Sequence, residues 1–90
     1  MSEVRFVVTG GSGFIGTNFM EWALSSKHTV INFDIRPPKI LNHQEKWKFV
    51  DIRDLKKFKE ALVEFCPTHI IHLAATTGMD VHDFSFFDAN

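Results

Sequence analysis

The chain has 90 residues, so we expect one small domain with a single core and modest stability. Its formal net charge is -1, with 10 basic and 11 acidic residues mixed along the chain, and no basic field is present to attract nucleic acid or an anionic membrane. The single cysteine, Cys66, excludes an intramolecular disulfide and is expected to be a small buried side chain in a reducing compartment. Apolar runs are too short for a signal-peptide core or a membrane span. We therefore expect a cytoplasmic protein that binds neither nucleic acid nor membrane.

The first half of the chain alternates strand and helix patterns. Residues 4–9 (VRFVVT) are β-branched and aromatic and are followed by a glycine, which predicts a buried strand. Residues 14–26 have helical spacing, and Lys27 and His28 suit the carboxyl end of a helix. The predicted apolar face of this helix consists of Ile15, Phe19, Trp22 and Ala23. Residues 29–35 (TVINFDI) form a second predicted strand, which ends before two prolines.

The second half repeats this alternation. Residues 39–46 are polar and are predicted to form a loop, and residues 47–52 (WKFVDI) a third strand. Asp54 is the predicted N-cap of a second helix, which Pro67 ends. The apolar stripe of that helix consists of Leu55, Phe58, Leu62 and Phe65. Residues 69–75 (HIIHLAA) predict a fourth strand, and residues 81–90 begin another helical pattern.

Strands that alternate with helices favour a parallel sheet with right-handed crossovers, as in a Rossmann-type α/β fold. If the fourth strand returns beside the first, the strand order is 3-2-1-4. The expected ligand site is then the crevice at the carboxyl ends of strands one and four.

A glycine-rich loop joins the first strand to the first helix, and it reads Gly10-Gly11-Ser12-Gly13-Phe14-Ile15-Gly16. Gly10 permits a tight turn, Gly13 lets the backbone approach a pyrophosphate, and Gly16 lets the helix pack closely on the sheet. The amides of Phe14 and Ile15 then face the phosphates at the positive end of the helix dipole. No Lys-Ser/Thr pair follows the loop, which argues against a nucleoside triphosphatase. The loop predicts dinucleotide binding.

Asp34 lies 18 residues after Gly16 (34 − 16), at the end of the second predicted strand. A carboxylate at this place accepts hydrogen bonds from the hydroxyls of an adenosine ribose, and its charge repels a 2′-phosphate. This favours NAD over NADP. Arg36 keeps NADP open, because a nearby arginine accommodates a 2′-phosphate.

Four segments together resemble the extended short-chain dehydrogenase/reductase family, in particular its NAD-dependent epimerases and dehydratases acting on nucleotide sugars. They are the Gly-x-x-Gly-x-x-Gly spacing, Phe33-Asp34, Asp51-Ile52-Arg53-Asp54 and His72-Leu73-Ala74-Ala75. The resemblance implies that the Asp51 carboxylate accepts from the adenine amino group and that the Ile52 amide donates to the ring. It also implies that Leu73, Ala74 and Ala75 line the dinucleotide.

The chain departs from this family in its catalytic residues. The resemblance covers essentially all 90 residues but only the front portion of a family member, and the sequence contains no tyrosine. The family's Tyr-x-x-x-Lys pair and its substrate lobe are therefore missing. We expect residues 1–90 to be the N-terminal part of an NAD(P)-binding domain, with no catalytic residue and no activity alone. The histidines and aspartates between residues 69 and 83 lack a metal-ligand spacing, so no metal is expected.

Two alternatives stay open. The chain could be a stand-alone, non-catalytic dinucleotide-binding or assembly module, and its open fourth-strand edge or the helix around residues 84–87 would then favour self-association. It could also be a fragment of an NADP-dependent carbonyl reductase of the same family, a reading supported by Arg36 alone.

Overall fold

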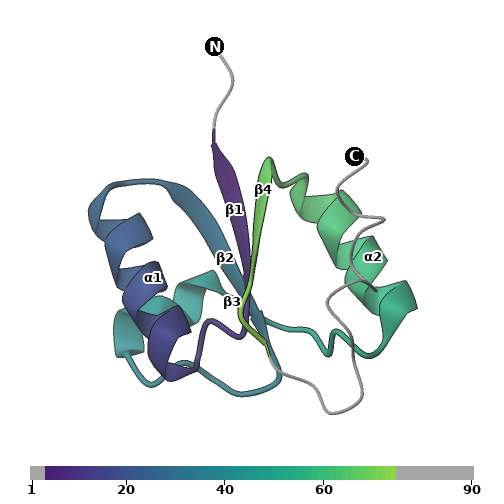
Figure 1. Cartoon of the computed structure of the whole chain (residues 1–90), viewed down its shortest axis with the longest axis horizontal. Coiled ribbons are helices and arrows are strands. Elements are labelled where there is room, and N and C mark those ends of the chain that lie inside the picture. Colours follow the sequence, from purple (N-terminus) through teal and green to yellow (C-terminus); the bar gives the residue numbers. More distant parts are fainter. Residues whose placement is uncertain (1–3, 75–90) are drawn as a thin grey trace.

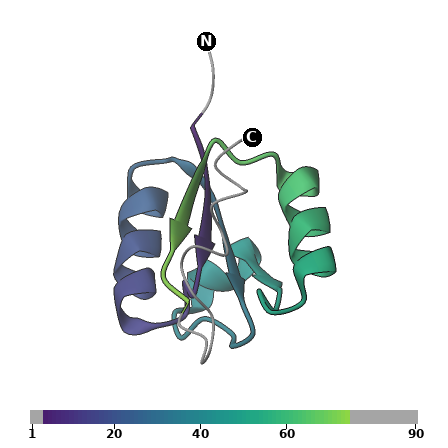
Figure 2. The ribbon, with the colours of Figure 1, turned by 45° about the vertical axis from the view of Figure 1, so that its right-hand side comes forward.

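The computed structural model describes residues 4–74, which form a four-stranded sheet with helices on both sides. The strands are β1 (Arg5–Thr9), β2 (Thr29–Asp34), β3 (Trp47–Phe49) and β4 (His69–His72). The helices are α1 (Phe14–Ser25), α2 (Leu55–Phe65) and the short 3-10 helix η1 (Leu41–Lys46). Figure 1 shows α1 and α2 on opposite sides of the sheet, and the turned view in Figure 2 separates the three layers.

The strand order is β3-β2-β1-β4, and all neighbouring strands run parallel, which confirms the predicted order and the Rossmann-type α/β class. Thr9 at the end of β1 stands beside Phe33 of β2 and His72 of β4. Because β1, β2 and β4 end almost level, the segments that follow them meet at one edge of the sheet. This is the lower edge in Figure 1, opposite the start of β1.

The core consists of one apolar cluster on each face of the sheet. Val7 and Phe33 belong to the cluster under α2, where the Phe33 ring meets the edge of Phe58 at a centroid distance of 6.2 Å. Val8 belongs to the cluster under α1, together with Met20. Successive strand side chains point to opposite faces, so both valines are buried. A strand buried on both faces needs a continuous apolar run, which explains the lack of polar alternation in β1.

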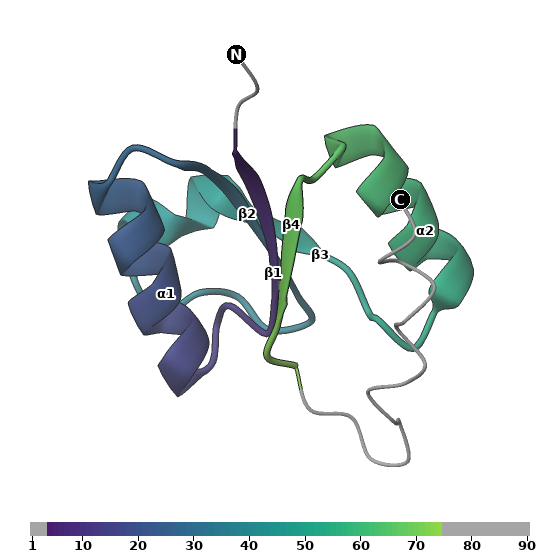
Figure 3. The same ribbon diagram turned by 45° about the horizontal axis from the view of Figure 1, so that its top comes forward.

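Three predicted segments differ from the structure, and one of them, the predicted strand 69–75, ends already at His72. The predicted strand 47–52 ends already at Phe49, since Val50 and Ile52 turn into the cluster under α2. The predicted loop 39–46 contains η1, which lies on the α1 side of the sheet, as Figure 3 shows. Its His43 is buried, with Nε2 2.6 Å from Glu21 Oε1 of α1. This tertiary contact orders a segment whose polar composition indicated a loop.

The face that α1 buries also differs from the prediction. Ala23 is buried and Phe19 is partly buried, as predicted, but Ile15 is 66% exposed and Trp22 50% exposed. The helix buries Gly16 and Met20 in their place. The helix is rotated because Gly16 must face the glycine loop, as its contacts below show. At the carboxyl end, Lys27 and His28 follow the C-cap, as predicted, and close the helix through their backbones. Lys27 adopts a left-handed conformation with φ 62°, and the His28 amide donates a hydrogen bond to the carbonyl of Ala23 at 2.8 Å.

Helix α2 follows its predicted pattern more closely. Phe58 and Leu62 are buried and Phe65 is partly buried, while Leu55 at the helix start is exposed. The helix ends at Cys66, which adopts a left-handed conformation with φ 56° before the predicted proline stop. The expectation of a buried Cys66 is wrong, because this C-cap residue is exposed. Across residues 4–74, no helix combines the length and apolarity that a membrane crossing requires. Ala75 and the predicted helix over residues 81–90 lie outside the described residues.

Candidate functional site

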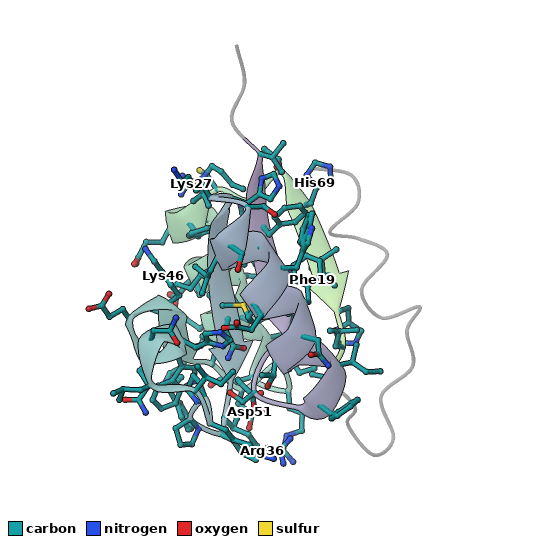
Figure 4. The ribbon with its side chains drawn as sticks, turned by 90° about the vertical axis from the view of Figure 1, so that its left-hand side faces the viewer. Phe19, Lys27, Arg36, Lys46, Asp51 and His69 are labelled. Atoms are coloured by element: carbon teal, nitrogen blue, oxygen red, sulfur yellow. The ribbon has the colours of Figure 1, made fainter. Side chains whose placement is uncertain are left out.

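The candidate site lies at the carboxyl edge of the sheet, where the segments after all four strands converge. Figure 4 shows Arg36, which follows β2, and Asp51, which follows β3, at this end of the molecule. His69, at the start of β4, lies at the opposite end. The predicted crevice residues are therefore brought to one edge, as a parallel sheet requires.

Gly10 and Gly16 are needed for the loop's own packing. Gly10 has a φ of 77°, and a Cβ there would lie 2.7 Å from the amide nitrogen of Ala74 and 3.0 Å from the carbonyl carbon of Leu73. A Cβ on Gly16 would collide with the carbonyl oxygen of Gly10 and lie 2.6 Å from the Cα of Gly11. The close approach that Gly16 permits is thus between α1 and the loop backbone, rather than between the helix and the sheet.

Gly13 has no such internal reason to be glycine. Its φ is -80°, and the nearest atoms to a Cβ there would be the Gly10 carbonyl oxygen at 3.5 Å and Arg36 Nη2 at 3.9 Å. Both distances allow a methyl group. A Cβ on Gly13 would therefore make only ordinary van der Waals contacts, and the packing of the loop does not require a glycine here.

The first turns of the two helices are satisfied differently. At α2 the Asp54 side chain accepts a hydrogen bond from the Lys57 amide at 3.3 Å, as predicted for an N-cap. At α1 the N-cap is Gly13, and no side chain caps the helix. The first-turn amides of α1, including those of Phe14 and Ile15, have no intrahelical acceptor and point toward the carboxyl edge of the sheet. They suit an anionic ligand.

Asp34 is held in place by two backbone amides. Its Oδ2 accepts from the Ser12 amide at 2.9 Å, and its Oδ1 accepts from the Arg36 amide at 3.0 Å. The side chain is 7% exposed. Each carboxylate oxygen keeps a second lone pair, so Asp34 retains acceptor capacity for ribose hydroxyls.

The sequence reasoning missed a buried polar network behind this carboxylate. Asn32 Oδ1 accepts from the Gly11 amide at 2.8 Å, and Asn32 Nδ2 donates to Ser12 Oγ at 3.0 Å. Ser12 Oγ donates in turn to the carbonyl of Arg36 at 2.8 Å. An available signal was the polar Asn32 within an otherwise buried strand, because a buried amide needs partners.

The segment after β3 holds the two residues implied in adenine recognition. Asp51 forms a two-pronged ion pair with Arg53, with Nε 3.0 Å from Oδ1 and Nη2 2.9 Å from Oδ2. Hydrogen bonds from the Arg53 side chain and backbone hold the pKa of Asp51 below its ordinary value. Asp51 thus stays an acceptor, although Arg53 already engages both of its oxygens. Ile52 is buried in the core, so its backbone alone remains for polar contacts.

The end of β4 is joined to the end of β1 through a threonine that the sequence reasoning also missed. Thr9 Oγ1 accepts from the amides of Leu73 at 3.1 Å and Ala74 at 3.3 Å, and it lies 2.6 Å from His72 Nδ1. The Leu73 amide also donates to the backbone carbonyl of Thr9 at 2.9 Å, so the two strand ends are joined through backbone and side chain together. Burial lowers the pKa of His72. Ala75, the remaining candidate here, lies outside the described residues.

The donor set of the described site matches a dinucleotide better than a metal. It offers an uncapped helix start at Gly13, and the buried carboxylate of Asp34 can accept from hydroxyl groups. Among residues 4–74, no three His, Cys, Asp or Glu side chains are grouped to hold a metal ion.

Comparison with known proteins identifies the family. Residues 6–85 match the model of the NAD dependent epimerase/dehydratase family. A probable dTDP-glucose 4,6-dehydratase of Sinorhizobium fredii is 33% identical, in a match that covers 86% of this chain and 25% of that protein. The Thermus thermophilus UDP-glucose 4-epimerase, solved in complex with NAD, is 36% identical with a TM-score of 0.70, and the match covers 81% of this chain and 24% of that one.

A dTDP-glucose 4,6-dehydratase of Bacillus anthracis in complex with NAD is 29% identical with a TM-score of 0.65, over 82% of this chain and 27% of that one. The chain therefore spans about a quarter of the length of these relatives. The family match and the glycine-loop geometry agree, and the chain belongs to the NAD-dependent epimerase/dehydratase family.

Proposed function

We propose that this chain binds NAD and is the cofactor-binding part of a nucleotide-sugar epimerase or dehydratase. The observation that carries the proposal is Gly13, because it lies at the uncapped start of α1 although the packing of the loop does not require a glycine there. The names of the relatives, a dTDP-glucose dehydratase and a UDP-glucose epimerase crystallised with NAD, support a nucleotide-sugar substrate.

In this proposal, each group of site residues binds a different part of the dinucleotide. The backbone of Gly10, Gly13 and Gly16 gives the loop its shape, and the amides of Phe14 and Ile15 bind the pyrophosphate. Asp34 accepts from the adenosine ribose, with Arg36 beside it. The adenine contacts come from Asp51 and Ile52, and the lining at the end of β4 from Leu73, Ala74 and Ala75.

NAD is the favoured cofactor because Asp34 is buried, ionisable and fixed. A 2′-phosphate would bring its negative charge toward this carboxylate in a poorly solvated place. Arg36 supports the NADP alternative, but its Nη2 lies 3.9 Å from the Cβ position of Gly13, which places the guanidinium toward the phosphate loop. Arg36 is therefore suited to the pyrophosphate as well as to a 2′-phosphate.

When bound, NAD supplies a hydride acceptor, and the part of this chain is to hold and orient it. The sequence has no tyrosine for the proton transfer that the family resemblance implies. We propose that the Tyr-x-x-x-Lys pair and the substrate lobe would have to come from residues outside this sequence, and that the chain alone turns over no substrate.

A calorimetric titration of the folded chain with NAD and NADP tests the proposal. Asp34→Ala should weaken NAD binding by roughly 10- to 100-fold, since it removes charged hydrogen bonds to the ribose. Asp34→Asn keeps the side-chain size but loses the charge, so it should narrow the preference for NAD over NADP. The control is Glu45→Ala, which removes an exposed carboxylate from η1 and should leave both affinities unchanged.

The outcome of the titration distinguishes the proposed function from its alternatives. A folded wild-type chain that gives no heat with NAD refutes the function, and unchanged affinity in Asp34→Ala refutes the role of Asp34. Tighter NADP binding would instead favour the carbonyl-reductase alternative.

The assembly-module alternative rests on β4. Within residues 4–74, β4 pairs with β1 alone, and Ile70, Ile71 and His72 are only partly buried. Such an open edge favours pairing with a second chain. We propose self-association through this edge, and sedimentation equilibrium over a range of concentrations tests it. A monomer throughout would exclude it.

A further inference from the structure

Asn32 is a fully buried amide in a strand whose neighbouring side chains are apolar. It is 0% exposed, between Ile31 and Phe33 in β2. A buried amide is costly unless its polar atoms are paired. Both of its groups are paired, and both partners lie in the glycine loop: Oδ1 accepts from the Gly11 amide at 2.8 Å, and Nδ2 donates to Ser12 Oγ at 3.0 Å.

Ser12, which is bonded to Asn32, is also bonded to Asp34, the carboxylate proposed to bind the ribose. The Ser12 amide donates to Asp34 Oδ2 at 2.9 Å, and Ser12 Oγ donates to the Arg36 carbonyl at 2.8 Å. The Arg36 amide donates to Asp34 Oδ1 at 3.0 Å, so Ser12, Asp34 and Arg36 are joined in a closed hydrogen-bond network. Ser12 is 3% exposed and Asp34 7% exposed, so water competes weakly for these bonds.

Sterics tie Asn32 to the loop as well. A Cβ on Gly11 would collide with the Asn32 side-chain amide, so the loop backbone lies directly against it. Because Asn32 is buried beneath the loop, it cannot touch a bound dinucleotide itself. Its effect on a ligand must pass through Gly11, Ser12 and Asp34.

We propose that Asn32 is a positioning residue that fixes the phosphate loop and the direction of the Asp34 carboxylate together. The proposal rests on the proposed dinucleotide function of the site. It couples two parts of the ligand: the pyrophosphate is held by the loop, and the ribose is held by Asp34. Loss of the Asn32 amide therefore weakens NAD binding and also loosens the discrimination between NAD and NADP.

The test compares Asn32→Leu, which keeps the side-chain volume but removes both hydrogen bonds, with the wild-type chain. Ile31→Leu is the matched control, because it alters packing on the same strand without touching the loop. Calorimetry with NAD and NADP is done well below the unfolding midpoint of each variant. Hydrogen exchange of the Ser12 amide, measured by NMR without ligand, reports whether its bond to Asp34 persists.

In Asn32→Leu, the Kd for NAD should rise about tenfold, and the NAD-to-NADP affinity ratio should fall about threefold or more. The Ser12 amide should exchange about tenfold faster, whereas the control should match the wild type in all three measurements. Ser12→Ala keeps the amide that Asp34 needs but removes the hydroxyl bridge. It should show smaller changes in the same directions, and it replaces Asn32→Leu if that variant does not fold.

A lower unfolding midpoint with an unchanged Ser12 exchange rate and an unchanged affinity ratio would mean a purely structural role and would overturn the inference, while NAD binding itself would stand. A wild-type chain that is folded but binds no NAD would instead refute the proposed function, and the positioning of a dinucleotide would fall with it.

Discussion

Replacing Gly16 or Gly13 with alanine should separate the packing role of the loop from its ligand role. In Gly16→Ala, the new methyl group would collide with the carbonyl oxygen of Gly10 and lie 2.6 Å from the Cα of Gly11. These are backbone atoms, so they cannot rotate out of the way as a side chain can. Overpacking of this kind costs about 1–3 kcal/mol, and the better helix propensity of alanine offsets up to about 1 kcal/mol. We expect Gly16→Ala to lose about 1–2 kcal/mol of unfolding free energy. For a domain of this size, that lowers the thermal midpoint by roughly 5–15 °C.

Gly13→Ala should behave in the opposite way. Its methyl group would meet nothing nearer than 3.5 Å, and φ is -80°. The small loss of N-cap preference and the reduced entropy of the unfolded chain should nearly cancel, so the free energy of unfolding changes by about 0.5 kcal/mol or less. The methyl group would, however, occupy the space in front of the loop, so NAD affinity should fall at least about tenfold.

The assays are thermal and urea unfolding followed by circular dichroism, and NAD calorimetry on the same preparations. The reasoning would be refuted if Gly13→Ala lost as much stability as Gly16→Ala while binding NAD as tightly as the wild type. That result would give both glycines a packing role.

Two further predictions concern the ends of β1. Arg5 Nη2 donates to the Phe65 carbonyl at 2.7 Å, and the guanidinium carbon lies 4.4 Å from the centroid of the Phe65 ring. Arg5→Ala should therefore lower the free energy of unfolding by about 1–2 kcal/mol. In urea unfolding, Arg5→Lys should recover only part of this loss, and full recovery would contradict a role for the planar guanidinium. Burial lowers the pKa of His72 below its ordinary value of 6.5, so the unfolded chain binds a proton at a higher pH than the folded chain does. Stability should therefore fall as the pH drops through about 6.5. His72→Asn, which keeps a polar side chain beside Thr9, should flatten this dependence in unfolding curves measured between pH 5 and 8, and an equal slope in both proteins would argue against it.

Much of the fold follows from local sequence patterns. The apolar run of β1, the helical spacing after Gly13 and the N-cap at Asp54 each depend on neighbouring residues, and the structure places each element within a few residues of its predicted position. The order 3-2-1-4 follows because right-handed crossovers leave few topologies for such an alternation. The glycine loop and Asp34 could likewise be identified from the sequence, because each lies at the end of a predicted strand.

Other features were decided by contacts between distant residues. The buried face of α1 depends on Gly16 facing the loop, and η1 is ordered by the contact of His43 with Glu21, 22 residues away. Neither signal exists within a short sequence window.

The sequence by itself determined the alternating elements, the glycine loop and the acidic end of β2, because each of these is specified by residues close in the chain. Only the tertiary structure decided that Gly16 packs against the loop backbone rather than against the sheet, and that Asn32 lies beneath the loop. The bonds that join Asn32 and Asp34 to the loop span 20 to 22 residues. They form only when β1 and β2 lie side by side and bring their carboxyl ends together.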